Sequence, residues 1–208
     1  MPKDVRPAFA ALWNLDLAFA DVVATSSDPR LGAIRMDWWR ERLDELDQGV
    51  PAEPRLQAVA AELVPRDVRG TELSQLEDAW LPLIEPFPWG EAQAEGLRFR
   101  GRILFGIGAR LLSGAADDAE RAGALWSLVD GARHCTDLES RQFLLNDARG
   151  AISSDTAGRA PKPLRRLTGL AAIAARDALR SDPELSRNYW GRPLAALVHY
   201  LRGTLPRN

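Results

Sequence analysis

The sequence predicts an all-α protein built as one domain. Apolar residues recur every three or four positions along nearly the whole chain, which is the spacing of one helix face. No segment alternates apolar and polar residues between turn signals, so the sequence offers no convincing strand. The breaks between periodic segments are short, and 208 residues suffice for one domain with a sizeable core. We therefore expect a single domain over residues 1–208, with the Gly-, Ser-, Asp- and Pro-rich loop at 150–163 as its one soft joint.

The first two helices have clear start and stop signals. Pro7 suits the first turn of a helix that runs to about residue 23. Asp28 can cap the second helix, with Pro29 at its first position, and Gly49 and Pro51 end it. The residues that we expect to point inward from the second helix are Leu31, Ile34, Trp38, Leu43 and Leu46.

The remaining helices follow from the same signals. We expect them at residues 54–64, at 71–84 with Thr71 as the N-cap, and at 91–112, 117–137, 139–148, 164–180 and 193–202. Gly101, Gly106 and Gly108 lie inside the long helix at 91–112, where each glycine costs about 1 kcal/mol relative to alanine. We expect either a close approach by a neighbouring helix or a backbone that must leave space for a ligand.

Composition and charge exclude several classes of protein. The net charge of −2 gives no basic excess of the kind that nucleic-acid-binding proteins carry, so no nucleic-acid partner is expected. The single cysteine, Cys135, excludes an intramolecular disulfide. The N-terminus lacks the apolar core of a secretory signal, and the apolar stretches at 103–112 and 167–175 are too short or interrupted to span a bilayer. We expect a cytoplasmic protein without a transmembrane segment, for which peripheral membrane contact stays open.

Two segments of the first half resemble a known family. Residues 12–16, Leu-Trp-Asn-Leu-Asp, and residues 29–40, Pro-Arg-Leu-Gly-Ala-Ile-Arg-Met-Asp-Trp-Trp-Arg, resemble the start of squalene/phytoene synthase proteins. They are most similar to the divergent bacterial members near the mitochondrial complex I assembly factor of that family. Residues 98–105, Arg-Phe-Arg-Gly-Arg-Ile-Leu-Phe, resemble the family's central helix, and residues 126–133 resemble the helix after it. The resemblance is strongest over residues 12–46, and the chain is shorter than typical active synthases.

This resemblance implies a fold and a reaction. The implied fold is an isoprenoid-synthase-like helical bundle around a central cavity. The implied reaction, in active members, is that of a prenyltransferase that joins two prenyl diphosphates head to head. Departure of diphosphate needs magnesium ions to neutralise the developing charge, and paired carboxylates four residues apart on each of two helices hold those ions.

The paired carboxylates are incomplete in this sequence. Asp16 and Asp21 are five residues apart, which separates them by about 140° around a helix. Asp137 is the nearest match to the second pair, but arginine stands at the fifth position, Arg141. Both metal clamps are therefore expected to be lost, and the expected cofactor is none, with magnesium retained only if the protein is an enzyme.

A polar constellation remains near residue 130. Asp130, Arg133, His134 and Asp137 have the spacing i, i+3, i+4 and i+7 and would share one helix face. The candidate catalytic residues are Asp130, His134 as an acid–base or anion contact, and Asp137. Arg133 and Arg102 are the candidate substrate-binding residues. The alternative, which we prefer, is a solvated face held by an Asp–Arg or Asp–His pair.

Three functions are compatible with these residues. The first is a pseudoenzyme that acts as a binding or assembly-type factor, with a prenyl diphosphate or lipid-like ligand or a protein partner, peripheral to the inner membrane or free in the cytoplasm. The second is a magnesium-dependent prenyltransferase of isoprenoid biosynthesis with a reduced metal site on Asp130 and Asp137. The third is an unrelated helical interaction module. We favour the first, because the clamps are broken.

Overall fold

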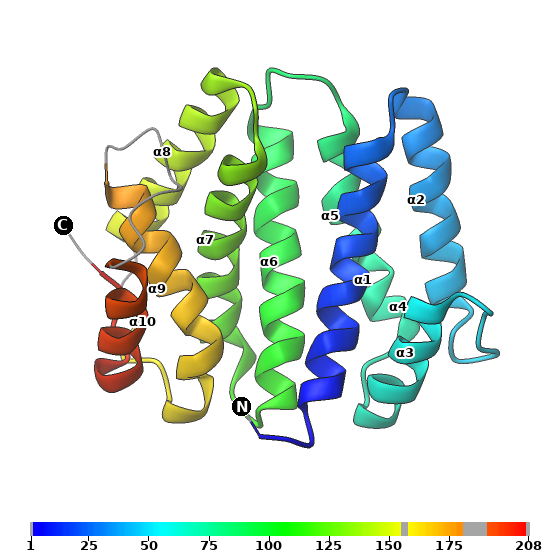
Figure 1. Cartoon of the computed structure of the whole chain (residues 1–208), viewed down its shortest axis with the longest axis horizontal. Helices are drawn as coiled ribbons and strands as arrows, with labels where there is room; N and C mark the ends of the chain where they lie inside the picture. Colours follow the sequence, from blue (N-terminus) through cyan, green and yellow to red (C-terminus); the bar gives the residue numbers. More distant parts are fainter. Residues whose placement is uncertain (1, 155–157, 181–190, 207–208) are drawn as a thin grey trace. The chain divides into compact units, whose positions relative to one another are not determined.

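The computed structural model describes residues 2–154, 158–180 and 191–206, and within these ranges it contains helices, turns and no strand (Figure 1). The all-α prediction is confirmed. The helices form two compact units, Met1–Pro86 and Phe87–Asn208. The boundary falls in a proline-rich turn and not in the segment at 150–163. A single domain with a central cavity stays a prediction, and each unit is described by itself.

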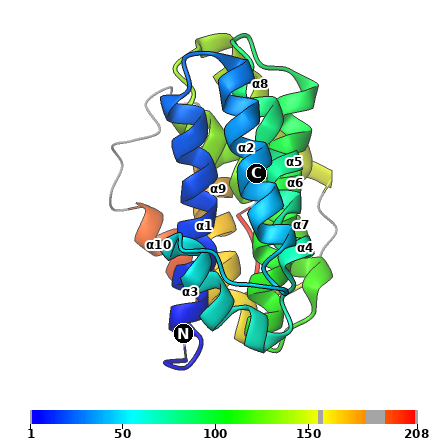
Figure 2. The same cartoon turned by 90° about the vertical axis from the view of Figure 1, so that its right-hand side faces the viewer.

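The first unit contains five α-helices and two short 3₁₀ turns in its described residues. They are α1 (Arg6–Thr25), α2 (Pro29–Asp44), α3 (Pro54–Glu62), η1 (Val64–Arg66), α4 (Gly70–Leu73), α5 (Gln75–Trp80) and η2 (Leu81–Ile84). Helix α1 packs against α2, α3 and α5, and Figure 2 shows α1 and α2 side by side. The core of the unit therefore forms around α1, whose inward face is fully apolar except for Asp16.

Most of the predicted helix starts in this unit are confirmed. The Asp28 side chain accepts a 2.8 Å hydrogen bond from the backbone N–H of Arg30, with Pro29 at the first helical position. The prediction that Thr71 caps a helix is wrong, because α4 begins at Gly70. A Cβ at Gly70 would lie 1.9 Å from the carbonyl oxygen of Leu43, so glycine is required where α4 meets the end of α2.

The predicted inward face of α2 is only partly right. Leu31, Ile34 and Trp38 are exposed, with relative exposures of 58, 63 and 43%. The residues that α2 buries are Gly32, Met36, Trp39 and Leu43. These positions also follow helical spacing, i, i+4, i+7 and i+11, so the sequence offers two apolar stripes. Trp39 belongs to the buried one, with its ring 6.1 Å from that of Phe19.

Helix α1 is the one helix in the described residues that is long and apolar enough to cross a membrane. Half of its apolar window is buried inside the structure. The core helix of a water-soluble protein and a signal sequence near the N-terminus both have this composition, so length and apolarity are weak evidence for a span. The absence of a transmembrane segment stays a prediction, and α1 is the segment on which it depends.

The second unit is built on a pair of long helices, α6 (Glu91–Leu111) and α7 (Ala116–His134). Around them the described residues form α8 (Leu138–Ser154), η3 (Lys162–Leu164), α9 (Arg165–Leu179) and α10 (Gly191–Arg202). Helix α7 contacts α6, α8 and α9, and α10 packs on α9 (Figure 1). Two predicted boundaries are wrong: α7 ends at His134, before residue 137, and α8 continues to Ser154, into the predicted loop at 150–163. Part of that loop, residues 155–157, lies outside the described residues.

A glycine contact explains why α6 and α7 pack so closely. A Cβ at Gly101 would lie 2.1 Å from the carbonyl oxygen of Gly123, and a Cβ at Gly123 would lie 2.1 Å from that of Gly101. The predicted close approach of a neighbouring helix is therefore confirmed for Gly101. Next to this contact, the rings of Phe105 and Trp126 lie 5.5 Å apart and fill the interface.

Candidate functional site

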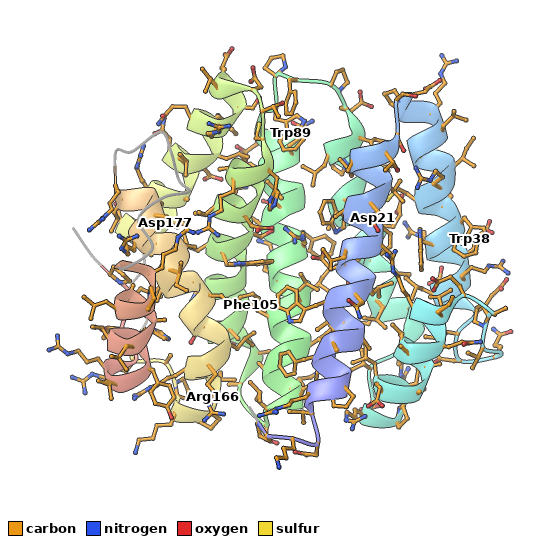
Figure 3. The ribbon with its side chains drawn as sticks, in the orientation of Figure 1. Asp21, Trp38, Trp89, Phe105, Arg166 and Asp177 are labelled. Carbon is orange, nitrogen blue, oxygen red and sulfur yellow. The ribbon has the colours of Figure 1, made fainter. Side chains whose placement is uncertain are left out.

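The two aspartates of α1 do not converge. Asp16 is buried, with 2% of its surface exposed, and its Oδ1 accepts a 2.9 Å hydrogen bond from the indole Nε1 of Trp80 on α5. Asp21, labelled in Figure 3, is exposed, and its carboxylate forms a 2.9 Å ion pair with Arg55 on α3. The five-residue spacing therefore places the two carboxylates on different partners, as the sequence predicts.

A second buried acid in this unit was missed by the sequence analysis. The Glu77 side chain is 3% exposed, and its Oε2 lies 2.7 Å from Nη1 of Arg40, which also binds Asp78 at 2.9 Å. Burial raises the pKa of Glu77, and the hydrogen bond from Arg40 opposes that rise. The signal was available: Glu77 directly follows Leu76 and lies three residues before Trp80, and both of these apolar residues are buried with it on α5.

In the second unit, Asp130 is joined to an arginine of the long helix α6. Nη1 of Arg100 lies 2.9 Å from Oδ2 of Asp130. Arg100 is buried, its guanidinium lies 4.8 Å from the ring centroid of Trp126, and it also donates to Ser127. The Asp130 carboxylate is thus held between α6 and α7 by a fixed cation.

His134 and Asp137 do not complete a shared site with Asp130. The His134 side chain is 79% exposed, and its Nδ1 lies 2.9 Å from the backbone carbonyl oxygen of Asp130 and 3.9 Å from Oδ1 of that residue. The prediction that Asp137 shares this helix face is wrong, since the helix ends at His134 and Cys135 has an extended backbone. The predicted catalytic group is therefore divided between the end of α7 and the turn that follows it.

Asp137 instead organises the start of α8. Its Oδ2 accepts hydrogen bonds from the backbone N–H and the hydroxyl of Ser140, at 2.8 and 2.5 Å. These two bonds lower the pKa of Asp137. The neighbouring Cys135 thiol is 1% exposed, and burial raises its pKa. The local structure of this turn accounts for the carboxylate of Asp137 without any metal or substrate.

Arg133 belongs to a separate cluster centred on Asp177 of α9, which Figure 3 labels. Asp177 is 5% exposed and lies within 2.6 Å of Arg133, 2.8 Å of Arg176 and 2.8 Å of Arg192, measured between guanidinium nitrogens and carboxylate oxygens. Three guanidinium groups face one carboxylate. Nε of Arg133 and Nη2 of Arg176 are buried and make no hydrogen bond within the described residues. The cluster therefore carries an excess of positive charge, which favours an anion nearby, while both unpaired nitrogens are covered by protein atoms.

Arg102, the other candidate for substrate binding, lies apart from this cluster. It pairs with Glu95 of its own helix, and its guanidinium lies 5.8 Å from the ring of Phe99. Its side chain is 37% exposed. Arg102 therefore has the contacts of a surface arginine, whereas Arg100, two residues earlier, points into the α6–α7 interface.

The arrangement offers no convergent set of metal ligands in the described ranges. Within residues 2–154, 158–180 and 191–206, no three His, Cys, Asp or Glu side chains are grouped so that they could hold a metal ion. The aspartates that the sequence resemblance singles out, Asp16, Asp21 and Asp137, form hydrogen bonds or ion pairs with protein groups.

The described residues form an all-helical protein, and its buried acids, Asp16, Glu77 and Asp177, accept hydrogen bonds from protein side chains. The squalene/phytoene synthase family model matches residues 1–76. The match confirms the resemblance over these 76 of the 208 residues. All of the matched residues lie in the first unit. Comparison with curated proteins and with solved structures gave no match.

Proposed function

We propose that this chain is a divergent squalene/phytoene synthase-like protein that binds an anionic ligand without condensing prenyl diphosphates. The observation that carries the proposal is the engagement of the acids: Asp16 with Trp80, Asp130 with Arg100, and Asp137 with Ser140. Magnesium is held by carboxylate oxygens, and diphosphate cannot leave readily unless cations neutralise it. A carboxylate that already accepts from a protein donor has fewer lone pairs left for a metal ion, and the guanidinium beside Asp130 also repels a cation.

The Arg133–Asp177 cluster supports the binding part of the proposal. Its net positive charge, with three guanidinium groups against one carboxylate, favours a phosphate-bearing ligand. The resemblance of the sequence to squalene/phytoene synthases suggests the chemical class of this ligand, a prenyl diphosphate. The Trp-Trp-Arg motif at residues 38–40 resembles the bacterial branch near the mitochondrial complex I assembly factor. On this resemblance we propose an assembly-type role, in the cytoplasm or at the inner membrane.

A condensation assay tests the loss of catalysis. The purified chain is incubated with magnesium and farnesyl or geranylgeranyl diphosphate, and hydrocarbon product is measured. We expect none. Product that disappears in Asp130→Asn would overturn the proposal and establish the alternative, a magnesium-dependent prenyltransferase.

Calorimetry tests the binding. We expect farnesyl diphosphate to bind without magnesium, and Arg133→Gln to weaken binding about tenfold or more, because a charge-assisted hydrogen bond is lost. Arg176 and Arg192 still pair with Asp177 in this variant, and thermal unfolding checks that it folds. The matched control is Arg102→Gln, an arginine-to-glutamine change on the surface of α6. Equal affinities in both variants, or no binding by the wild type, would contradict the assignment of the cluster.

A further inference from the structure

The last described helix, α10, presents its large apolar side chains to solvent. They recur at i, i+3, i+4 and i+7, which is one continuous helix face. Their relative exposures are 60, 53, 38 and 66% for Leu194, Leu197, Val198 and Leu201. A surface helix of a globular protein normally turns such a face toward the core. In α10 this apolar stripe faces solvent instead.

The opposite face of α10 is fixed by its packing on α9. His199 is 1% exposed; its Nε2 lies 2.8 Å from the hydroxyl of Thr168 on α9, and its Nδ1 lies 3.1 Å from the carbonyl oxygen of Thr204. Arg165 of α9 also donates to the backbone carbonyls of Tyr200 and Leu201. The helix cannot rotate to bury the stripe without losing these contacts.

The charge around the stripe indicates what covers it. Helix α10 contains no acidic residue. Residues 158–208 hold ten arginines and lysines against three aspartates and glutamates, a net charge of +7, whereas the whole chain carries −2. Arg166 of α9, labelled in Figure 3, lies over the ring of Tyr200 at 6.0 Å, and Arg202 is exposed at the end of the helix. A basic segment carrying an exposed apolar stripe is typical of helices that lie in a membrane interface.

We propose that α10 docks the protein on an anionic membrane surface. The leucines and Val198 enter the boundary between headgroups and acyl chains, while arginines of α9 and α10 face the phosphates. A second copy of the chain is disfavoured as the occupant, because it would bring an equally basic segment against this one. The proposal goes beyond ligand binding by the Arg133–Asp177 cluster and does not depend on it.

Vesicle flotation of the full chain tests the proposal. We expect binding to phosphatidylcholine vesicles with about one third phosphatidylglycerol, and at least about tenfold weaker binding to pure phosphatidylcholine or at high salt. The double variant Leu197→Gln/Leu201→Gln should bind at least about tenfold more weakly. The matched control is Leu138→Gln, which replaces a leucine that is 70% exposed at the start of α8. Arg166→Gln with Arg202→Gln should remove much of the preference for the anionic lipid.

Two results would overturn the assignment. One is unchanged vesicle binding by the Leu197→Gln/Leu201→Gln variant, or no binding by the wild type. The other is a wild-type dimer in light scattering that dissociates in the double variant while neither protein binds vesicles, which would make a second copy the occupant. Circular dichroism of each variant separates loss of docking from loss of folding, because the substituted leucines are exposed.

Discussion

The indole Nε1 of Trp80 donates a 2.9 Å hydrogen bond to the carboxylate of Asp16, 64 positions earlier in the chain. Both residues are buried in the first unit, Asp16 on α1 and Trp80 on α5. A buried carboxylate requires donors, since an unsatisfied charge away from water is costly. The buried aspartate on α1 therefore depends on the tryptophan of α5 as its hydrogen-bond donor.

Replacing Trp80 with phenylalanine should destabilise the protein by about 1–3 kcal/mol, because a donor to a buried carboxylate is lost. Urea unfolding followed by circular dichroism measures the change. The matched control is Trp38→Phe, at a position that is 43% exposed, and it should change stability by no more than about 0.5 kcal/mol. Equal effects of the two substitutions would show that the Asp16 bond contributes nothing specific.

Because Gly101 and Gly123 are in close contact, adding one methyl group at Gly101 should destabilise the protein. Gly101→Ala would place its Cβ 2.1 Å from a backbone oxygen of α7, and the helices must separate at a cost of about 1–3 kcal/mol or more. Gly150→Ala is the control, since a Cβ there meets nothing within 4 Å on the exposed face of α8. That control should stabilise the protein by about 0.5–1 kcal/mol. Measuring the free energy of unfolding of both variants tests whether Gly101→Ala destabilises and Gly150→Ala stabilises the protein. An unchanged free energy in Gly101→Ala would contradict the close approach of the two helices.

Burial lowers the pKa of His199 below the ordinary value of 6.5. The unfolded chain therefore binds a proton near pH 6.5 that the folded chain resists, so stability should fall as the pH drops through this value. We expect the wild type to be less stable at pH 5.5 than at pH 7.5, and the difference to shrink in His199→Gln. Denaturant unfolding at both pH values measures it. A variant with the same pH dependence as the wild type would show that His199 does not titrate with folding.

The cap formed by Asp137 predicts an effect on stability and none on ligand binding. Asp137→Ala should lower the midpoint of thermal unfolding by a few degrees at neutral pH, whereas Asp137→Asn, which keeps a cap acceptor but loses the charge, should lower it less. Hydrogen bonds from Ser140 lower the pKa of Asp137 below 3.8, so its contribution is present above that pH and disappears as pH falls through the folded pKa. Loss of farnesyl diphosphate binding in Asp137→Ala, with an unchanged midpoint, would instead restore Asp137 as a site residue.

Local signals predicted most of the helices, and they failed where two local patterns competed. Asp28 and Pro29 fix the start of α2, but two apolar stripes share its sequence, and Trp38 and Trp39 stand on different ones. Which stripe is buried depends on neighbours such as Phe19, which the sequence of α2 does not contain. Asp137 was assigned to α7 by continuing its period, although an aspartate three residues before Ser140 is itself a start signal for α8.

The site was less predictable than the fold because its contacts are long-range. Arg133 was recognised as a candidate, but its partner Asp177 lies 44 positions away on another helix. Arg100 and Asp130 are 30 positions apart, and only the packing of α6 on α7 brings them together. Spacing along one helix shows which residues share a face, whereas the identity of the partner depends on the tertiary arrangement.

The buried Cys135 gives the protein an internal reporter of local opening. Its thiol is 1% exposed at the junction of α7 and α8, and burial raises its pKa, so the reactive thiolate is scarce in the closed state. Alkylation must then wait for that junction to open, and because the sequence contains one cysteine, the modification rate comes from this place alone. The opening frequency of one helix–helix turn can therefore be followed in the unmodified chain by mass spectrometry.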